Sequence, residues 1–430
     1  MKYMLFLRTI LVSIITLTIS CISAQKHSRI LLDHGFLHVG NGQVVENALI
    51  GIKDGKIILV RNSLAYTYDK KDWDTIIDLK GQQVYPGFIA PNSTLGLTEI
   101  DAVNASLDFN EVGVFNPHVR AQIAFNVESN VISTVRTNGV LIAQATPRGG
   151  TITGSSAIMQ LNGWNWEDAT ILADDGIHLQ WPESLQSNRR DPSSTKKSES
   201  YEDEKTEINQ FFQLAKAYSE TNIHEKNDLR LEAMKMCFKG SKRVYIHAND
   251  IQQLLDVLDF VKKFDLKFPV IVGGYDSYLA TQQLKDAKIP VMLPRVHSLP
   301  ENEEDAVDLP FKLPALLQAG GVKFCLQNEG DMEAMNARNI PFLAGTAKTY
   351  GLTEEQAIQS VTLSSCEIIG ISKEYGSIEE GKNATLFVST GNALDMLTNK
   401  VTLAIVDGIY VDLVNSQEKL FNKYSEKYVK

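Results

Sequence analysis

Residues 243–273, RVYIHANDIQQLLDVLDFVKKFDLKFPVIVG, contain two short apolar runs on either side of a longer amphipathic segment. Apolar side chains in the middle segment recur every three or four residues, which predicts a helix with one buried face. These residues are Ile251, Leu254, Leu255, Leu258 and Val261. A strand, a helix and a second strand in this order predict a right-handed parallel βαβ unit.

The same alternation extends in both directions along the chain. Short apolar runs, each expected to be a buried strand, lie at Val140–Ala145, Ile177–Trp181, Val244–His247, Val270–Val272, Val291–Leu293 and Val322–Leu326. Periodicity alone leaves a closed barrel and an open doubly wound sheet both possible. Neither GxGxxG nor GxxxxGK[ST] follows any of these runs, so a nucleotide-binding open sheet gains no support.

The two ends of the chain have a different pattern. Ala48–Ile52 and Lys56–Val60 flank an Asp-Gly pair, and a second Asp-Gly pair separates Thr402–Val406 from Ile409–Leu413. Asp-Gly between apolar runs is typical of a tight β-hairpin, because both residues tolerate positive φ. We therefore expect one small sheet domain that is assembled from both ends of the chain.

Composition excludes several classes of protein. The chain has 430 residues, of which 43% are hydrophobic and 22% charged, which is typical of a folded globular protein. Its formal net charge is -10, and no basic stripe interleaved with aromatic residues is present, so nucleic-acid binding is not expected. Three cysteines remain beyond the first 24 residues, and none lies in a CxxC motif, so we interpret Cys237, Cys325 and Cys366 as packing residues.

The amino-terminal residues 1–24 resemble a secretory signal peptide. Lys2 and Arg8 precede an apolar run that is too short to span a bilayer, which needs about 20 residues. Small residues before Gln25 provide a cleavage site. We expect an exported, periplasmic protein with no membrane association after cleavage. Lipidation at Cys21 is a less favoured alternative, because Thr18 stands where a lipoprotein signal has Leu.

Two further segments carry little apolar pattern. Residues 183–205 are rich in Ser and charge, which predicts a solvated, mobile insert; a flap over the site is the alternative. Residues 416–430 are expected to form a carboxyl-terminal tail.

Motifs near both ends of the mature chain resemble the amidohydrolase superfamily, closest to its imidazolonepropionase-like branch. The matching segments are Gly42, Ala48–Ile57, Ile77–Asp78, Gly81, Val84–Ile89, Tyr350–Ala357, Val361–Leu363, Ile369–Gly370 and Gly376–Val388. This resemblance implies a (β/α)8 TIM-like barrel over residues 86–375. It also implies a small β-sandwich domain built from residues 26–85 and 376–415.

The resemblance further implies metal-assisted hydrolysis of amide-like C–N bonds, with ligands at the carboxyl ends of barrel strands. Asn92 and Thr94 stand where the family has its first two His ligands, and Gly273 stands where it has a later one. His247 and Glu329 are retained at ligand positions, Glu329 in place of an Asp. Two protein ligands are too few for a catalytic zinc, so we assign no metal ligands and expect no cofactor; zinc is disfavoured.

The candidate catalytic residues are therefore His247 as a base and Glu329 as an acid. Candidate binding residues are Asn92, Thr94 and the loop residues Arg148, Gly149 and Gly150, which follow a predicted strand. Such a loop can direct backbone N–H groups and a guanidinium at a carbonyl or anion. A tight turn that needs positive φ at its glycines is the equally weighted alternative. The other histidines, including His178, are interpreted as surface or core residues.

Two functions remain open at this stage. The first is an exported hydrolase of amide, cyclic amide or peptide-like bonds that uses a reduced site. The second is a catalytically silent barrel that binds a small amide-like molecule or a partner subunit. That partner would be a second copy of the chain or an intact amidohydrolase.

Overall fold

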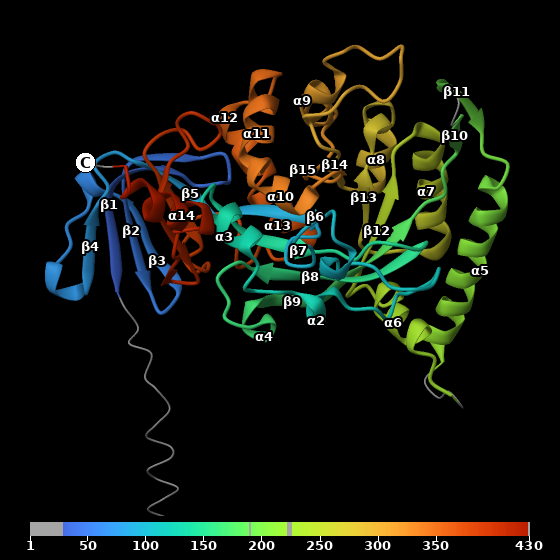
Figure 1. Ribbon diagram of the computed structural model, residues 1–430, viewed down its shortest axis with the longest axis horizontal. Helices are drawn as coiled ribbons and strands as arrows, with labels where there is room; N and C mark the ends of the chain where they lie inside the picture. The colour runs from blue at the N-terminus through green and yellow to red at the C-terminus, as the bar shows by residue number, and fades with distance from the viewer. Residues whose placement is uncertain (1–28, 189–190, 222–225, 429–430) are drawn as a thin grey trace, which may run out of the picture.

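The computed structural model describes residues 29–188, 191–221 and 226–428, so the predicted signal peptide and Cys21 lie outside the described residues. The strands form two eight-stranded sheets and one two-stranded sheet. The first large sheet lies on one side of the molecule and the second forms its centre (Figure 1). In the described part of the chain, no helix combines the length and apolar character needed to cross a membrane.

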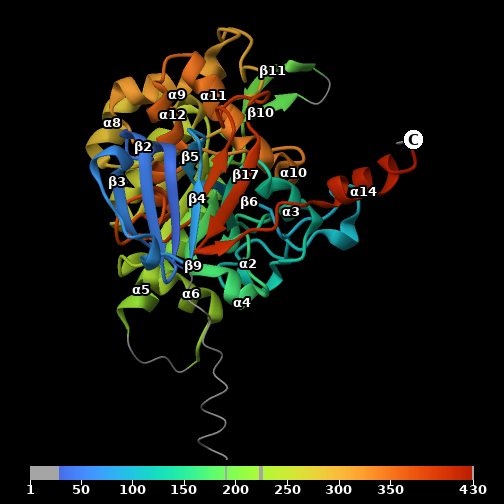
Figure 2. The ribbon, with the colours of Figure 1, turned by 90° about the vertical axis from the view of Figure 1, so that its left-hand side faces the viewer.

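The first sheet draws its strands from both ends of the chain, as predicted (Figure 2). Its order is β18-β17-β16-β5-β1-β2-β3, with β4 paired to β1. The strands are β1 Ile30–His38, β2 Val44–Lys53, β3 Lys56–Asn62, β4 Thr75–Asp78, β5 Gln83–Pro86, β16 Leu386–Ser389, β17 Val401–Val406 and β18 Ile409–Tyr410. The pairing gives one continuous sheet, which supports the expected sandwich domain in part.

Both predicted hairpins are present in this sheet. Asp54 and Gly55 join β2 to β3 with φ values of 53° and 76°. Asp407 and Gly408 join β17 to β18 with φ values of 49° and 81°. Both residues of each pair thus adopt the left-handed conformation that these tight turns require.

The second sheet curves into a nearly closed barrel. Its order is β6-β7-β8-β9-β12-β13-β14-β15. The strands are β6 Phe88–Ser93, β7 Val140–Ala145, β8 Ile152–Gln160, β9 Thr170–Gln180, β12 Arg243–Ala248, β13 Pro269–Gly273, β14 Val291–Leu293 and β15 Phe324–Leu326. Each of the six apolar runs expected to be a strand coincides with, contains or lies within one, except that Ile177–Trp181 extends one residue beyond β9.

The barrel differs from an all-parallel (β/α)8 arrangement at β8, which runs antiparallel to both β7 and β9. Only the six residues 146–151 connect β7 to β8. A parallel neighbour needs a crossover of about a dozen residues or more, so this connection forces the chain to return antiparallel. The remaining strand pairs of the barrel sheet are parallel.

The space between the first and last barrel strands is covered by the segment around α13 (Leu363–Ile369), which contacts both β6 and β15. The backbone N–H of Ile89 on β6 donates to the carbonyl of Val361 at 2.9 Å. Apolar side chains from seven barrel strands and from α13 and the residues after it form one buried cluster. It includes Ile89, Ile142, Ile158, Val270, Met292, Cys325, Cys366 and Ile369.

The remaining helices surround the barrel or lie in its connections (Figure 1). They are α2 Ala121–Ala124, α3 Asn130–Arg136, α4 Trp166–Ala169, α5 Tyr201–Glu220, α6 Leu229–Phe238, α7 Ile251–Phe264, α8 Thr281–Ala287, α9 Leu309–Gly320, α10 Glu333–Asn336, α11 Ile340–Thr349, α12 Glu354–Ser360 and α14 Ser416–Ser425. Helix α14 lies within the segment expected to be a tail. Cys237, Cys325 and Cys366 are free and buried, which confirms them as packing residues.

The predicted helix between β12 and β13 is present as α7. Asp250 and Gln253 form a capping box at its start. Its most deeply buried apolar residues are Leu254, Val257, Phe260 and Phe264. The helical face is therefore rotated from the predicted one, and Leu255 is 40% exposed.

The polar segment 183–205, expected as a mobile loop, instead contains secondary structure. Strands β10 (Leu185–Asn188) and β11 (Asp191–Lys197) form a hairpin, and α5 begins at Tyr201. Both sides of the hairpin are anchored to α7 and its cap. Ser184 Oγ donates to Asp250 Oδ2 at 2.7 Å, and the Tyr201 hydroxyl donates to Asp256 Oδ2 at 2.7 Å. These two bonds tie the residues on either side of the hairpin to α7 and its cap.

Candidate functional site

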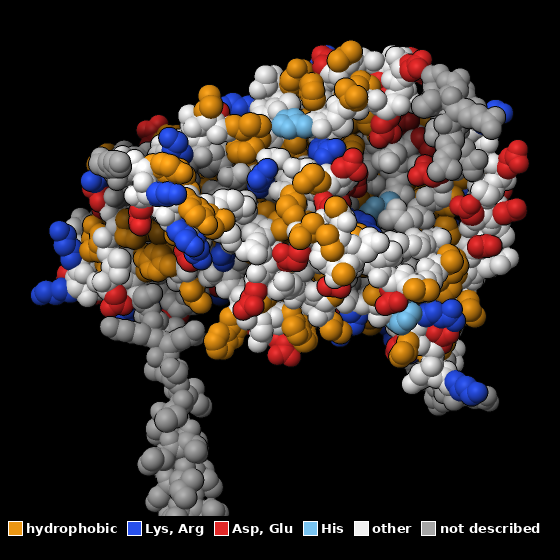
Figure 3. Space-filling view, viewed as in Figure 1, with side chains coloured by type: hydrophobic (Ala, Val, Ile, Leu, Met, Phe, Trp, Pro, Cys, Tyr) orange, Lys and Arg blue, Asp and Glu red, His pale blue; other side chains and the backbone are white. Residues whose placement is uncertain are grey.

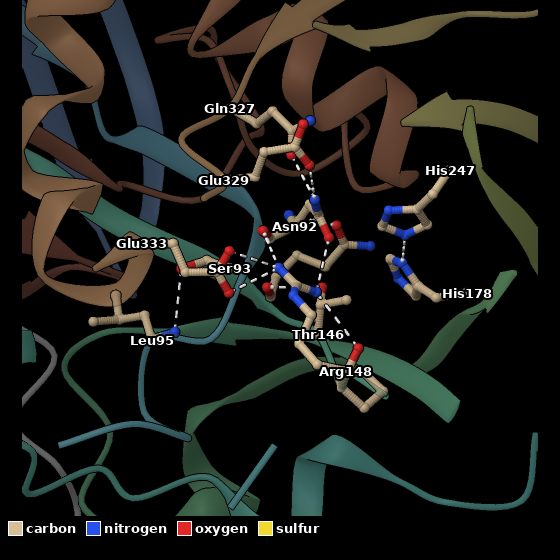
Figure 4. Close-up of polar contacts among 12 residues, drawn as sticks. Asn92, Ser93, Leu95, Thr146, Arg148, His178, His247, Gln327, Glu329 and Glu333 are labelled. Carbon is tan, nitrogen blue, oxygen red and sulfur yellow. Dashed lines mark hydrogen bonds and ion pairs between the residues drawn. The ribbon is translucent and has the colours of Figure 1, made fainter. Parts of the chain in front are cut away.

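Polar side chains from five strands meet at the carboxyl ends of β6, β7, β9, β12 and β15, which we call the barrel mouth (Figure 4). Asn92 on β6 lies at their centre and is only 1% exposed. Its backbone has φ of 46°, a left-handed conformation that Asn tolerates better than most residues. Its Nδ2 donates to Gln327 Oε1 at 2.6 Å and to Glu329 Oε2 at 3.2 Å. Asn92 therefore joins the first barrel strand to the last.

The positively charged guanidinium of Arg148 lies against Asn92. Its Nη1 donates to Asn92 Oδ1 at 3.0 Å and its Nη2 to the Asn92 carbonyl at 2.9 Å. Nη2 also forms an ion pair with Glu333 Oε1 at 2.9 Å. The guanidinium and the carboxylate are 21% and 12% exposed. A planar guanidinium suits this use, because its donors are held in a rigid fork.

Two histidines lie side by side on adjacent strands. His178 on β9 approaches His247 on β12, with 3.0 Å between His178 Nδ1 and His247 Nε2. The His178 ring also stacks on Tyr245, with 4.5 Å between the ring centroids. Burial, assisted by the charge of Arg148, lowers the pKa of His247 to about 3. Burial and the neighbouring His247 lower the pKa of His178 well below its ordinary value, so both rings are neutral at neutral pH.

A carboxylate lies beneath the histidines. Asp175 is 3% exposed, and its Oδ2 accepts from the Tyr245 hydroxyl at 2.6 Å and from Gln144 Nε2 at 2.9 Å. Its Oδ1 accepts from Ser156 Oγ at 2.7 Å. Burial raises the pKa of Asp175, whereas the hydrogen bonds from Tyr245 and Ser156 act in the opposite direction. Gln144 also accepts the Asn92 backbone N–H at 2.9 Å, which links this carboxylate to the mouth.

Glu329 is an acidic group of the mouth with a raised pKa. Burial raises its pKa to about 7, the charge of Arg148 opposes this shift, and the charge of Glu333 adds to it. A carboxyl group with a pKa near 7 can hold or release a proton at neutral pH. The predicted pair His247 and Glu329 thus lies in one site with Asn92 and Arg148.

The other predicted binding residues, Thr94, Gly149 and Gly150, do not take part in this hydrogen-bond network of described residues. Thr94 is buried, but among the described residues no hydrogen bond joins its side chain to the mouth. Gly149 and Gly150 have φ values of 84° and 73°. A Cβ on Gly149 would collide with the Asn110 side chain, and one on Gly150 would lie 2.7 Å from the Gly113 carbonyl. The structure therefore favours the tight-turn alternative for these two glycines.

A cavity of about 700 Å³ opens beside the mouth, between the β10–β11 hairpin, the start of α7 and the residues after β13. Figure 3 shows a hollow on this face where acidic and histidine side chains gather. The acidic residues that line the cavity are Glu183, Glu202, Asp250, Asp276 and Glu301, and Lys197 is the basic one. Burial raises the pKa of Glu301 to about 7, and the charges of Asp276 and then Glu329 add to this. The charge of Glu301 in the cavity therefore interacts with the charge of Glu329 in the mouth.

Comparison of the chain with known proteins identifies its family. The model of the amidohydrolase family matches residues 129–412. The chain belongs to the amidohydrolase family. No match was found among curated proteins.

Solved structures share the fold of this amidohydrolase. An amidohydrolase from Thermotoga maritima MSB8 is 23% identical with a TM-score of 0.76, covering 89% of this chain and 99% of that one. A prolidase complexed with N-methylphosphonate-L-proline is 15% identical with a TM-score of 0.55, covering 90% and 100%. An A. niger ochratoxinase is 12% identical with a TM-score of 0.55, covering 92% and 99%.

The residues at the mouth of this chain do not fit a divalent metal ion. Within the described ranges, no three His, Cys, Asp or Glu side chains converge as a metal site. The Asn92 side-chain and carbonyl oxygens are the groups on β6 that could supply electron pairs to a metal ion. Both already accept hydrogen bonds from the Arg148 guanidinium. Gly273 has φ of 90°, and a Cβ there would meet Asn249 Oδ1. A second cation would have to displace or face the guanidinium.

The sequence-based interpretation missed several residues of the site. Those with hydrogen bonds in the network are Gln144, Ser156, Asp175, His178, Tyr245, Gln327 and Glu333. His178 is a hydrogen-bonded core histidine, one of the two expected states, but its contact with His247 was not predicted. One signal could have found two of them: Gln144 and His178 are polar residues inside runs predicted to be buried strands. A buried polar side chain needs a partner, which points to a polar network.

Proposed function

We propose that the barrel mouth binds a small amide-bearing molecule without a divalent metal ion. The observation that carries this proposal is the Arg148 guanidinium on the two oxygens of Asn92. The mouth keeps the features of a binding site, since it joins a cavity to a few convergent polar groups with perturbed pKa values. Metal-assisted hydrolysis, the chemistry implied by the family, lacks its ligand set here.

The lining of the cavity indicates the charge of the bound molecule. Five acidic residues and one lysine line it, and mutual repulsion among carboxylates contributes to the raised pKa of Glu301. A molecule with a neutral amide and a positively charged group would relieve this repulsion, whereas an anionic molecule would increase it.

A binding experiment with paired probes tests this proposal. We expect N-acetyl-lysine amide to bind more tightly than N-acetyl-glutamate amide by calorimetry, with no effect of EDTA. Elemental analysis of protein purified without chelators is expected to show less than stoichiometric zinc, manganese and iron. Stoichiometric metal, or affinity that EDTA abolishes, would overturn the metal-free proposal. Equal binding of the two probes would overturn the charge argument alone.

A second candidate is slow, metal-independent hydrolysis of the same class of amide, favoured by the pKa of about 7 at Glu329. Glu329 would carry the proton, because His247 with a pKa of about 3 is a weak base. Release of ammonia from N-acetyl-lysine amide is the measurement. If the activity is real, Glu329→Gln abolishes it, whereas Glu367→Gln, a partly exposed carboxylate bonded to Lys323, leaves it unchanged.

We also propose that the protein is exported. Residues 1–24 have the charged start, short apolar run and small-residue site of a signal peptide. Amino-terminal sequencing of the mature protein from a periplasmic fraction is expected to begin at Gln25. An unprocessed amino terminus would contradict export by this route.

A further inference from the structure

A chain of hydrogen bonds runs from the buried carboxylate of Asp175 to the barrel mouth. Ser156 Oγ lies 2.7 Å from Asp175 Oδ1 and 2.9 Å from His178 Nε2. His178 Nδ1 in turn lies 3.0 Å from His247 Nε2. Asp175, Ser156 and His178 have relative exposures of 3%, 0% and 0%, so water does not compete for these bonds. We call these three residues the relay.

The direction of each bond follows from the number of protons available. With Asp175 ionised, all of its hydrogen bonds are accepted ones, and the donors are Tyr245, Gln144 and Ser156. The single hydroxyl proton of Ser156 is therefore donated to Asp175, and Ser156 Oγ can only accept from His178. This places the proton of neutral His178 on Nε2 and leaves a lone pair on its Nδ1.

The last step fixes His247. Because His178 Nδ1 carries a lone pair, His247 must donate from Nε2, and its own lone pair is on Nδ1. In the described part of the chain, His247 Nδ1 has no hydrogen-bond partner and is not enclosed. Figure 4 shows the free nitrogen of this ring turned toward Asn92 and Glu329.

We propose that Asp175, Ser156 and His178 are positioning residues that hold His247 with its proton on Nε2, so that Nδ1 accepts an N–H from the molecule bound in the mouth. This deepens the proposed function, because it selects amides that carry an N–H over fully alkylated ones. It rests on the proposed function only for the identity of the bound molecule. The protonation pattern of the free protein stands by itself.

One isosteric substitution reverses the whole chain of bonds. In Asp175→Asn the amide oxygen can remain at the Oδ2 position, where Tyr245 and Gln144 donate. The amide nitrogen then faces Ser156 and donates to it. Ser156 then donates to His178 at 2.9 Å in preference to the Gly176 carbonyl at 3.4 Å, His178 donates to His247, and the proton of His247 moves to Nδ1.

The test is long-range 15N–1H NMR of the histidine rings in the full chain, with His247 assigned by loss of its signals in His247→Gln. We expect wild type to show His247 protonated at Nε2 and Asp175→Asn to show it protonated at Nδ1. Asp174→Asn changes the neighbouring carboxylate, which pairs with Arg120 on the surface, and should keep the wild-type pattern. Wild type protonated at Nδ1, or no change in Asp175→Asn, would overturn the relay.

Two further variants keep the test decisive if Asp175→Asn does not fold. Ser156→Ala removes the link between carboxylate and ring, so His247 should become a mixture of both tautomers. Tyr245→Phe removes a donor to Asp175 without changing the direction of any relay bond, so the wild-type pattern should persist. An unmixed wild-type tautomer in Ser156→Ala would contradict the relay.

A ligand titration then separates the relay from the proposed function. Acetamide should shift the His247 Nδ1 signal of wild type, and N,N-dimethylacetamide should not. If neither probe shifts any resonance of the mouth while the tautomers behave as expected, the relay stands and amide binding fails. If both probes bind equally with the same shift at Nδ1, the proposed selection for N–H is wrong.

Discussion

The two layers of the barrel interior are built on opposite physical principles. The layer next to α13 is apolar and closely filled, with Ile142, Met292 and Cys366 at most 1% exposed. The layer at the mouth contains a cation, three carboxylates and two imidazoles that are held by hydrogen bonds. Apolar packing is non-directional and stabilises by burial, whereas a buried polar network is favourable only when each member is satisfied. The apolar layer therefore specifies the fold, and the mouth is the layer that binding can use.

The largest expected effect comes from the apolar layer. Ile142→Ala should lower the free energy of unfolding by about 4 kcal/mol, because it leaves a cavity among side chains that cannot collapse. Urea denaturation measures this loss. Ile100→Ala, at a residue that is 55% exposed, should change stability by less than ~0.5 kcal/mol. The His247 tautomer should be unchanged in both variants. A loss as small in Ile142→Ala as in Ile100→Ala would remove the contrast between the layers.

In the mouth, the next largest effect is expected from Arg148→Met. The change leaves the Glu333 carboxylate and the Asn92 oxygens without their donors, which should cost about 2–3 kcal/mol of stability. It should also raise the pKa of His247, because the charge of Arg148 contributes to lowering it. Denaturation and a histidine NMR titration measure the two effects. Arg120→Met, which breaks a surface pair with Asp174, should cost less than ~1 kcal/mol and leave the His247 pKa unchanged.

The apolar layer was largely predictable from sequence. Of the strands that contribute to it, β7, β12, β13, β14 and β15 correspond to predicted apolar runs, whereas β6 and β8 do not. Such runs depend only on local composition and spacing. The one strand direction that differed, that of β8, depends on the length of a connection. Residues 146–151 were weighed equally as a binding loop and as a tight turn, and neither interpretation specifies the direction of the strand that follows.

The mouth was predictable at the positions where the family resemblance places ligands and at one glycine-rich loop. Asn92, His247 and Glu329 were found in this way, and Arg148 from its glycine-rich loop. His178 and Asp175 were not found, because their roles depend on contacts between strands distant in sequence. Ser156 is 19 residues from Asp175 and 22 from His178, and His178 is 69 from His247. No local pattern encodes such separations.

A smaller effect concerns the pH dependence of the mouth. Burial raises the pKa of Glu329 to about 7 from an ordinary value of 4.5. A raised carboxyl pKa contributes stability that is present below about pH 4.5 and is lost as the pH rises through about 7. Glu329→Gln should therefore lose less stability than wild type between pH 5 and pH 8, by at least the ~1.4 kcal/mol of one pKa unit. Urea denaturation at both pH values measures this difference. Glu367→Gln should follow wild type, and a parallel pH dependence of all three proteins would contradict the shift.

The smallest effect is expected when the lost metal ligands are restored. EDTA should leave the melting temperature of wild type unchanged. Asn92→His with Thr94→His should gain little from zinc, because the Arg148 guanidinium still places a positive charge at this position. Adding Arg148→Ala should lower the zinc Kd. At a zinc concentration equal to the Kd of this triple variant, the triple variant should gain about 0.4 kcal/mol and the double variant less.

Gly273→His is left out of this series because the φ of 90° and the contact with Asn249 would strain any side chain there. Differential scanning fluorimetry across a zinc titration compares the double and triple variants directly. If the variant without Arg148 binds zinc no better than the one that keeps it, the guanidinium is not what excludes the metal. In that case the mouth is still the polar layer of the barrel, but Arg148 does not close it to a second cation.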